Sequence, residues 1–572
     1  MKSPHPKTEM LLNRSRTIGI VGAIAGLPPR AFDLRPLRPV WQGVLEGGYI
    51  ADVDLRLHGV TPGAATSVIP AGLEAYPENV AGWARNPSIA YSPGVGGRSA
   101  AAVLALDDPA HFGWAVADSL SPATWTLQSA STMGTPNPAA PRLGTNIYAD
   151  GGQLLPGPSG FVLAVFKATE FGSGRTRAAI SVSTDGGRSF GTSQRIDDDD
   201  AATVLFLHAT MLDETYGWLA YAAAASTGAR EADGLKVRKF RVDSTGVLSF
   251  ITPAIRVPGV TGRVAWPQIA TYTDSSSGEV VLVAYSDRGY ALNIDAAPET
   301  VTYSVVVYTS GTGWLGPRAA RVVSSHPGVR PGTYEAYDER GPYGRRGMTI
   351  ANPCRPALVA APELRGALLA TTFSYVTDGG SPATMIELSY PLNLLGRHPT
   401  LPQIWKPLTV VGGGDFPYWT LMPAVARDPV DGTIVLAYYQ CLPGSDAAVA
   451  VNALVLRRDP VRSSYGPGES APMLGYRATG AQLQRDFFPA GQSSPPEPAY
   501  RGGLPVPYAL GDAPSVVSLA APAGSRDPTS PARFLVAWTR NGRIWIRRPG
   551  DPDFYPPQVA VATLHALPLS PY

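Results

Sequence analysis

A pattern of short segments recurs seven times along the chain. Each unit opens with a small residue or a proline ahead of a short apolar segment, and a Gly- or Pro-containing turn leads to a second apolar segment. The seven openings begin at Pro87, Thr145, Ala209, Pro267, Pro356, Pro423 and Pro514. Copies of a small unit stack on one another because a single copy cannot bury both of its faces. The repeat therefore predicts an array of stacked units.

The segments within each unit follow a fixed order. The second segments cover residues 100–106, 161–166, 217–222, 280–286, 367–373, 433–439 and 533–539. Their nearly unbroken apolar composition is typical of strands that are covered on both faces. Alternating third strands are predicted at 112–119, 177–183, 235–243, 302–309, 383–390, 450–458 and 542–548. A weaker fourth strand follows in each unit, the last of them at 558–563.

Four antiparallel strands per unit predict an all-β fold, a β-propeller of seven four-stranded blades over residues 85–572. Six blades with one extra sheet is the alternative count, and a set of β-sandwich domains is the alternative architecture. The shared openings and the second strands with alanine beside an aromatic residue favour the propeller. Residues 1–84 are predicted to form an N-terminal arm and extension, and 324–353 and 460–511 to be long insertions.

Composition limits the partners and cofactors of this chain. With 47 Lys and Arg against 45 Asp and Glu, the net charge is +2, which gives no overall basic field for nucleic acid or a membrane surface. Cys354 and Cys441 are too few for a four-cysteine zinc site and leave open one disulfide or two thiols. The sequence has no His-x-x-x-His pair and no phosphate loop. We therefore expect neither a metal nor a cofactor.

The longest apolar run near the N-terminus is Ile18–Leu27, which is too short to span a bilayer. It follows basic residues, as the apolar region of a signal peptide does, but Pro28-Pro29-Arg30 stands where a small-residue cleavage site would be expected. We interpret residues 1–40 as a Pro- and Arg-rich arm that docks on another protein subunit. No membrane span is expected.

A turn motif follows the third strand of the second unit. Ser183-x-Asp185-x-Gly187-x-Ser189-Phe190 contains Asp-Gly after an alternating run, which is a strong hairpin signal. The motif resembles the Asp-box, or bacterial neuraminidase repeat, of sialidases and related propellers, with Ser in place of the usual Thr and Phe in place of the usual Trp. The resemblance implies a turn between the third and fourth strands of a blade, on the face away from the catalytic centre.

The resemblance also implies a chemistry that the chain can be searched for. Sialidases use three arginines to bind a carboxylate, a Tyr nucleophile paired with a Glu, and an Asp acid/base. The candidate catalytic set is Arg85, Arg142 and Arg355, which precede blade openings, with Tyr334 and Glu335 from the loop before the fifth unit. The Phe-Arg-Ile-Pro motif of the family is missing. The alternative role of these arginines is a solvated or ion-paired rim residue.

Aromatic and acidic residues provide further candidates. Trp83, Trp266, Tyr418 and Trp419 lie at blade entrances, where stacking on a sugar ring is one role and packing in the propeller core is the other. The run Asp197–Asp200 lacks the alternate spacing of a cation-binding loop, so we expect a solvated turn there.

The preferred hypothesis is a non-enzymatic structural or adhesive propeller displayed on an extracellular assembly, such as a virion or a cell-surface structure. It rests on a clear scaffold, an incomplete catalytic set and an arm suited to docking. Its partners would be other subunits, contacted through residues 1–40 and the two insertions, and glycans. The alternative is a sialidase-like exo-glycoside hydrolase that uses the candidate catalytic set on an acidic sugar. An intracellular protein-interaction propeller is a third class.

Overall fold

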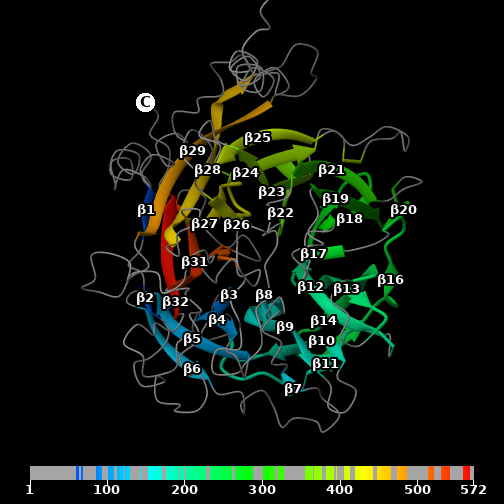
Figure 1. Cartoon of the computed structure of the whole chain (residues 1–572). Helices are drawn as coiled ribbons and strands as arrows, with labels where there is room; N and C mark the ends of the chain where they lie inside the picture. Colours follow the sequence, from blue (N-terminus) through cyan, green and yellow to red (C-terminus); the bar gives the residue numbers. More distant parts are fainter. Residues whose placement is uncertain are drawn as a thin grey trace, which may run out of the picture.

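The computed structural model of the chain is a ring of β-sheets, and the order of the sheets around the ring follows the sequence (Figure 1). It describes residues 60–62, 66–67, 85–92, 101–107, 112–120, 123–128, 142–143, 152–169, 175–191, 193–198, 201–226, 232–260, 264–287, 300–315, 320–327, 355–364, 366–376, 382–391, 394–395, 405–411, 419–441, 448–464, 473–485, 513–520, 530–540 and 558–566. Helix within these ranges is limited to two 3₁₀ turns, Pro158–Gly160 and Pro362–Leu364. None of the described helices is long and apolar enough to cross a membrane.

Antiparallel strands build the sheets of the first half of the chain. The first sheet contains β3 (Arg85–Ser92), β4 (Ala101–Asp107), β5 (Phe112–Leu120) and β6 (Ala123–Gln128). The second contains β8 (Gln153–Pro156), β9 (Val162–Thr169), β10 (Thr176–Ser183) and β11 (Gln194–Arg195), with β7 (Arg142–Leu143) also paired to β9. The third contains β12 (Thr203–Met211), β13 (Tyr216–Ala224), β14 (Gly234–Val242), β15 (Leu248–Phe250) and β16 (Ile255–Arg256). The fourth contains β17 (Val264–Asp274), β18 (Gly278–Asp287), β19 (Thr300–Thr309), β20 (Gly313–Trp314) and β21 (Ala320–Pro327).

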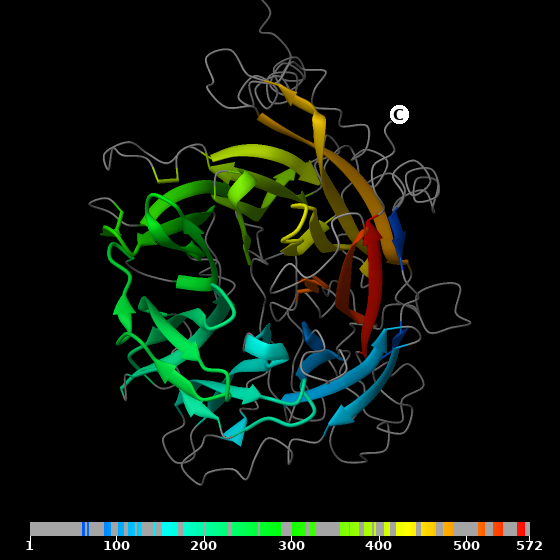
Figure 2. The same ribbon diagram turned by 180° about the vertical axis from the view of Figure 1, so that it is seen from behind.

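Two sets of four strands share the next sheet. One set is β22 (Ala357–Ala361), β23 (Gly366–Val376), β24 (Pro382–Pro391) and β25 (Trp405–Val411). The other is β26 (Trp419–Arg427), β27 (Ile434–Cys441), β28 (Ala448–Ser464) and β29 (Met473–Arg485). A single parallel bridge between Thr384 and Trp419 joins the two sets. The β28–β29 hairpin takes up part of the predicted insertion 460–511 and extends beyond the ring (Figure 2).

The last sheet combines both ends of the chain. It contains β30 (Ser515–Ser518), β31 (Ala532–Arg540), β32 (Gln558–Ala566), β1 (Val60–Pro62) and β2 (Thr66–Ser67). Both β1 and β2 pair with β32, which therefore occupies the third place in its set. The expectation that 558–563 is a fourth strand is wrong, because an N-terminal strand takes that place. The third strand expected at 542–548 lies outside the described residues.

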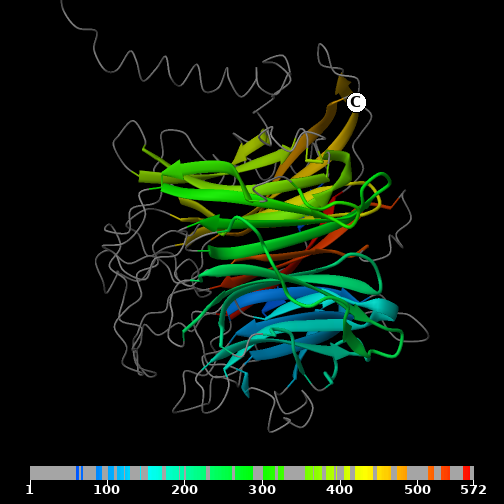
Figure 3. The same ribbon diagram turned by 90° about the vertical axis from the view of Figure 1, so that its right-hand side faces the viewer.

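Seven inner strands form a closed cycle around the ring axis. Each of β3, β8, β12, β17, β22, β26 and β30 contacts the next, and β30 contacts β3. Seen edge-on, many strands run across the thickness of the ring (Figure 3). The prediction of an all-β propeller is confirmed. Parts of several strand sets and of the predicted N-terminal extension lie outside the described residues, so the number of complete blades and the boundary at residue 84 stay predictions.

The apolar core lies between neighbouring sheets rather than in one central mass. In the largest clusters, second strands supply fully buried side chains such as Leu219, Val283 and Trp538. Leu535 of the last sheet packs in one cluster with Ile89 of the first sheet, so the two ends of the ring share a core. The nearly continuous apolar composition of the second strands follows from this burial on both faces.

The Asp185 turn, Ser183–Phe190, joins β10 to β11. The Asp185 carboxylate accepts hydrogen bonds from Ser183 Oγ at 2.7 Å, from Ser189 N at 2.9 Å and from Ser189 Oγ at 2.6 Å. Burial raises the pKa of Asp185, but the bonds from Ser189 and then Ser183 outweigh it and hold the pKa below its usual value. Gly187 adopts φ 90°, where a side chain would be strained. The turn lies between the third and fourth strands of its set, as expected, and the Asp-box resemblance stays a prediction.

The solvated turn expected at Asp197–Asp200 is found only in part, because Asp198 is exposed, Asp197 is buried, and the last two residues lie outside the described ranges. Asp197 is 3% exposed, and its Oδ2 lies 2.7 Å from Arg195 Nη2 and 3.4 Å from Arg177 Nη1. Its Oδ1 accepts the amide proton of Ala178 at 2.9 Å. The expectation is wrong for Asp197 because two arginines from β10 and β11 and a backbone amide compensate its charge. Within the described ranges, no three His, Cys, Asp or Glu side chains are grouped so as to hold a metal.

Candidate functional site

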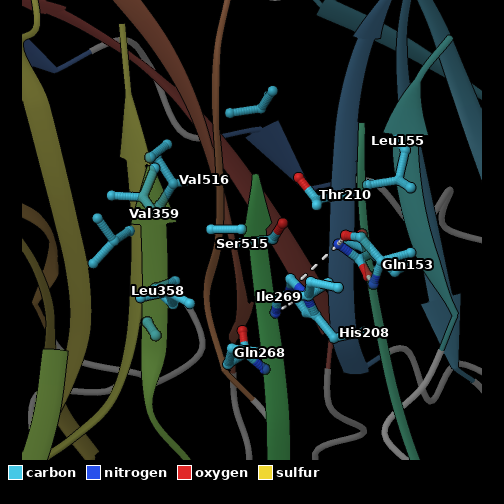
Figure 4. A pocket seen from close by; sticks show the side chains of 18 of the residues that line it. Gln153, Leu155, His208, Thr210, Gln268, Ile269, Leu358, Val359, Ser515 and Val516 are labelled. Carbon is cyan, nitrogen blue, oxygen red and sulfur yellow. Dashed lines mark hydrogen bonds between the residues drawn. The ribbon is translucent and has the colours of Figure 1, made fainter. Parts of the chain in front are cut away.

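The inner strands enclose a channel along the ring axis. A cavity of about 400 Å³ in this channel is lined by residues of β3, β8, β12, β17, β22, β26 and β30 (Figure 4). Every set of strands contributes to the lining. The cavity is therefore the place where side chains far apart in the sequence meet.

One position recurs on every inner strand, and we call it the channel position. Its residue pairs with an alanine of the second strand in six sets, as Ser88 pairs with Ala105, and with Val165 in the remaining set. The seven residues in the channel position are Ser88, Gln153, His208, Gln268, Ala357, Ala424 and Ser515. Because their places in the fold are equivalent, differences between them reflect the chemistry of the channel wall.

Four of these residues form a polar belt, in which each side chain accepts an amide proton from the next inner strand. The four bonds are Ile89 N to Ser515 Oγ at 3.0 Å, Leu154 N to Ser88 Oγ at 2.8 Å, Ala209 N to Gln153 Oε1 at 2.7 Å and Ile269 N to His208 Nδ1 at 3.1 Å. The channel-facing edge of an inner strand has unpaired amides, and each belt bond satisfies one of them, on β3, β8, β12 and β17. The four bonds therefore connect four successive pairs of neighbouring inner strands, from β30 to β17.

The His208 ring is neutral, and its single N–H proton is on the nitrogen that does not take part in the bond to Ile269. Since Nδ1 accepts from Ile269, the neutral ring carries its proton on Nε2. Burial, and after it the positive charge of Arg355, lower the pKa of His208 to about 3. The Nε2 atom lies 3.4 Å from Nε2 of Gln153, which is also an N–H donor. Gln153 Nε2 donates one proton to the carbonyl oxygen of Ala209 at 2.9 Å. Two donors do not bond to each other, so its second N–H and that of His208 suit an acceptor atom in the channel.

Arg355 brings a positive charge to the same cavity. It lies two residues before β22, lines the cavity and is partly exposed. Its charge is close enough to contribute to the lowered pKa of His208. Arg355 is the member of the candidate catalytic set that the structure places in the channel.

The other members of the candidate set are placed by their backbone alone or not at all. Arg85 is the first residue of β3, where it pairs with Asp107 in the ladder. Arg142 is the first residue of β7, opposite Thr169 of β9. Tyr334 and Glu335 lie outside the described residues. The convergence of three arginines with a Tyr and a Glu therefore stays a prediction.

The candidate aromatic residues do not gather in the described part of the channel. Trp266 is 2% exposed and packs on Phe206, with ring centroids 4.7 Å apart, so its ring lies in the core as the alternative interpretation expects. Trp419 is the first residue of β26, but its side chain is not described. Trp83 and Tyr418 lie outside the described residues. Stacking on a sugar stays a prediction for these three.

The channel has an apolar wall opposite the donors. Figure 4 shows Leu358, Val359 and Val516 on one side of the cavity and Gln153 and His208 on the other. A pyranose or furanose ring has polar substituents at its edge and C–H groups on its faces, so a channel divided in this way matches its surface.

Acid–base groups are scarce in the described lining. Of the described lining residues, Asp213 is the only one with a carboxylate. Its Oδ1 accepts the amide protons of Thr215 and Tyr216, both at 2.7 Å, which fixes it in the β12–β13 turn. The described channel therefore explains ligand binding better than it explains bond cleavage.

Neither His208 nor Gln153 stands at one of the blade openings that the sequence pattern predicts. The pattern places the second opening at Thr145, which lies outside the described residues, whereas β8 begins at Gln153. It places the third opening at Ala209, one residue after the channel position. No fixed spacing to the second strand marks these two positions, because Gln153 pairs with Val165 rather than with an alanine and the separation between paired residues differs from set to set.

No protein-family model matches the chain, and no curated protein matches it. Among solved structures, the GH93 α-L-arabinofuranosidase of Fusarium graminearum with arabinobiose is 14% identical at a TM-score of 0.36, over 70% of this chain and 98% of that one. The α-L-arabinanase of Penicillium chrysogenum with arabinobiose is 11% identical at a TM-score of 0.33, and the match covers 66% of this chain and 94% of that one. A PL25 ulvan lyase, a polysaccharide lyase, is 11% identical at a TM-score of 0.32, and the match covers 72% of this chain and 96% of that one.

These three structures are enzymes that act on carbohydrates, and none is a structural or adhesive subunit. On this finding, the preferred hypothesis of a non-enzymatic structural or adhesive propeller on a virion or cell surface is wrong. The similarity is too distant to carry an argument about substrate or mechanism. Those are argued from the channel.

Proposed function

We propose that the chain is a carbohydrate-active enzyme, a glycoside hydrolase that binds an acidic sugar in the central channel. The observation that carries the proposal is the presence of Arg355 in one cavity with the N–H donors of His208 and Gln153. A guanidinium and neutral N–H donors together favour a carboxylate, which can accept several hydrogen bonds. The acidic substituent would therefore bind at this side of the channel.

Each residue has a separate part in binding. Arg355 supplies the charge, and a guanidinium binds a carboxylate through two parallel hydrogen bonds better than an ammonium does. His208 donates from Nε2 and stays uncharged at neutral pH because its pKa is about 3. The apolar wall with Leu358 and Val359 would pack against the C–H face of the sugar ring.

The cleavage step would fall to residues outside the described lining of the channel. Tyr334 and Glu335 stay the predicted nucleophile and its activating base, with Arg85 and Arg142 as further carboxylate ligands. An enzyme of this kind would meet polymeric substrates outside the cell, so we also propose an extracellular location. Residues 1–40, which lie outside the described residues, and the two insertions stay the proposed contacts with other subunits.

Turnover of fluorogenic glycosides tests the proposal. The panel contains an N-acetylneuraminide and a glucuronide as acidic glycosides and an arabinofuranoside as the neutral one. We expect turnover of an acidic glycoside, and we expect Arg355→Ala to lower its kcat/KM about 10- to 100-fold, the effect of losing hydrogen bonds to a charged group. Arg241→Ala, at an exposed position on β14, is the matched control and should change kcat/KM little.

Two outcomes would reject the proposal. One is the absence of turnover for every acidic glycoside by folded protein. The other is turnover that Arg355→Ala and Arg241→Ala leave equally unchanged. Faster turnover of the arabinofuranoside than of either acidic glycoside would reject the carboxylate assignment and keep a glycosidase.

A further inference from the structure

The polar belt is interrupted on one side of the channel. Ala357 and Ala424 occupy the channel position of β22 and β26, where the belt has Ser, Gln or His. An alanine side chain has no acceptor atom. The amides that would bond to it, those of the next inner strands, therefore receive no bond from that position.

The register identifies these amides. In the belt, the amide of the residue after the channel position donates to the preceding strand, as Ile89 N donates to Ser515 Oγ. Val425 follows Ala424 on β26, and Val516 follows Ser515 on β30, so their amides face Ala357 and Ala424. Both valines line the cavity and are partly exposed to it.

Backbone amides in such a place need an acceptor. An amide that leaves water without a new partner costs free energy, so an inner-strand amide without a side-chain acceptor would bond to an oxygen atom of water or of a ligand in the cavity. Val516 lies on the apolar wall, across the cavity from His208 and Gln153 (Figure 4). An oxygen bound here would therefore lie across the cavity from the N–H donors of His208 and Gln153.

We propose that the amides of Val425 and Val516 form a second subsite, which binds an uncharged oxygen, a hydroxyl or a carbonyl, of the acidic sugar. The subsite rests on the proposed function for the identity of the sugar. Uncharged donors among apolar side chains suit an uncharged acceptor, whereas the charged group belongs beside Arg355. The two alanines at Ala357 and Ala424 keep the amides open, and they determine where the sugar binds along the channel.

Serine at either alanine position tests the subsite. In Ala357→Ser and Ala424→Ser, the new Oγ stands where Ser88 and Ser515 already accept the neighbouring amide, so it competes with the ligand oxygen. The probe is D-glucuronate, and its affinity is measured by calorimetry next to the midpoint of thermal unfolding. We expect each serine to weaken D-glucuronate binding by up to about tenfold, the usual effect of one hydrogen bond. The unfolding midpoint should stay the same or rise, because each serine adds a bond.

The control and the outcomes keep the two proposals distinguishable. Ala254→Ser makes the same change outside the channel and should leave affinity unchanged. Ala424 is partly exposed, so Ala424→Ser remains informative if serine at the buried Ala357 prevents folding. Unchanged affinity in the folded serine variants overturns the subsite and leaves the enzyme proposal standing. Affinity that the serines lower in a protein without turnover keeps the subsite and rejects the enzyme. Failure of wild-type protein to bind D-glucuronate overturns the subsite.

Discussion

Trp114 and Phe190 meet edge to face across the boundary between the first and second sheets. Their ring centroids are 5.1 Å apart with an interplanar angle of 86°, and both side chains are almost fully buried. Trp114 Nε1 also donates a hydrogen bond to the carbonyl oxygen of Gly187 at 2.8 Å. The Asp185 turn is therefore fastened to the neighbouring sheet by its aromatic residue and by its own backbone.

Removal of the Phe190 ring should destabilise the ring of sheets. We expect Phe190→Ala to lower the free energy of unfolding by about 3–5 kcal/mol, because it leaves a cavity beside Trp114 and ends their edge-to-face contact. Thr184→Ala, at an exposed position of the same turn, should change it by less than about 0.5 kcal/mol. Chemical denaturation measures both. Equal effects of the two substitutions would show that the contact between Phe190 and Trp114 does not stabilise the packing of the two sheets.

The lowered pKa of His208 should make the stability of the protein depend on pH. Its folded pKa of about 3 lies below the ordinary value of about 6.5, so protonation favours the unfolded chain. The stabilising contribution is complete above pH about 6.5 and is lost as pH falls toward about 3. In His208→Gln the side chain can still accept from Ile269, as Gln153 accepts from Ala209, but it does not titrate.

Thermal unfolding across this pH range measures the difference. We expect the wild-type midpoint to fall more steeply between pH about 6.5 and 3 than that of His208→Gln, with the two closest near neutral pH. Parallel curves over the whole range would mean that His208 is free to protonate in the folded protein. That result would also remove the neutral donor from the proposed carboxylate site.

A partly buried ion pair connects the third and fourth sheets. Glu279 Oε2 lies 2.6 Å from Lys239 Nζ, with side-chain exposures of 13% and 17%, and its other oxygen accepts from Trp218 Nε1. Glu279→Gln keeps an acceptor but removes the charge, and we expect a loss of about 1.5–3 kcal/mol. Asp118→Asn, in the exposed Asp118–Arg188 pair, should cost less than about 1 kcal/mol.

The stability effects of the two ion pairs should also differ in how they depend on salt concentration. A pair that is largely shielded from solvent is screened less than an exposed one, so the effect of Glu279→Gln should persist in high salt while that of Asp118→Asn declines. Denaturation at low and high ionic strength measures both. If the two substitutions cost the same at each salt concentration, the Glu279 pair contributes no more than a surface contact.

The second strands could be predicted from the sequence because their signal is local. Burial on both faces gives an unbroken apolar run that can be read from neighbouring residues, as in β18 and β27. Closure of the ring has no such signal. The strands β1 and β2 are three and two residues long, and they pair with β32 near the other end of the chain. Neither length nor composition distinguishes them from a loop.

The channel could be predicted only in part, for a similar reason. Arg355 was recognisable because it stands before a proline opening, but His208 and Gln153 stand in units without that proline. A run of acidic residues is usually solvated, so the sequence predicts a solvated side chain for Asp197. Its arginine partners lie on two strands of the folded sheet, so the sequence does not show that its charge is compensated.

Two truncations test whether β1 and β2 close the ring. Deletion of residues 1–59 keeps both strands on β32, whereas deletion of 1–67 removes them and leaves that edge unpaired. Each lost backbone hydrogen bond costs about 0.5–1.5 kcal/mol, and an open edge strand invites association between chains. We therefore expect the longer deletion to unfold at a lower temperature and to aggregate more than the shorter one. The comparison isolates eight residues, so whatever residues 1–59 contribute cancels between the two proteins. Equal unfolding midpoints and equal aggregation would mean that the ring is held closed by the core that the last sheet shares with the first, through Leu535 and Ile89, without the N-terminal strands.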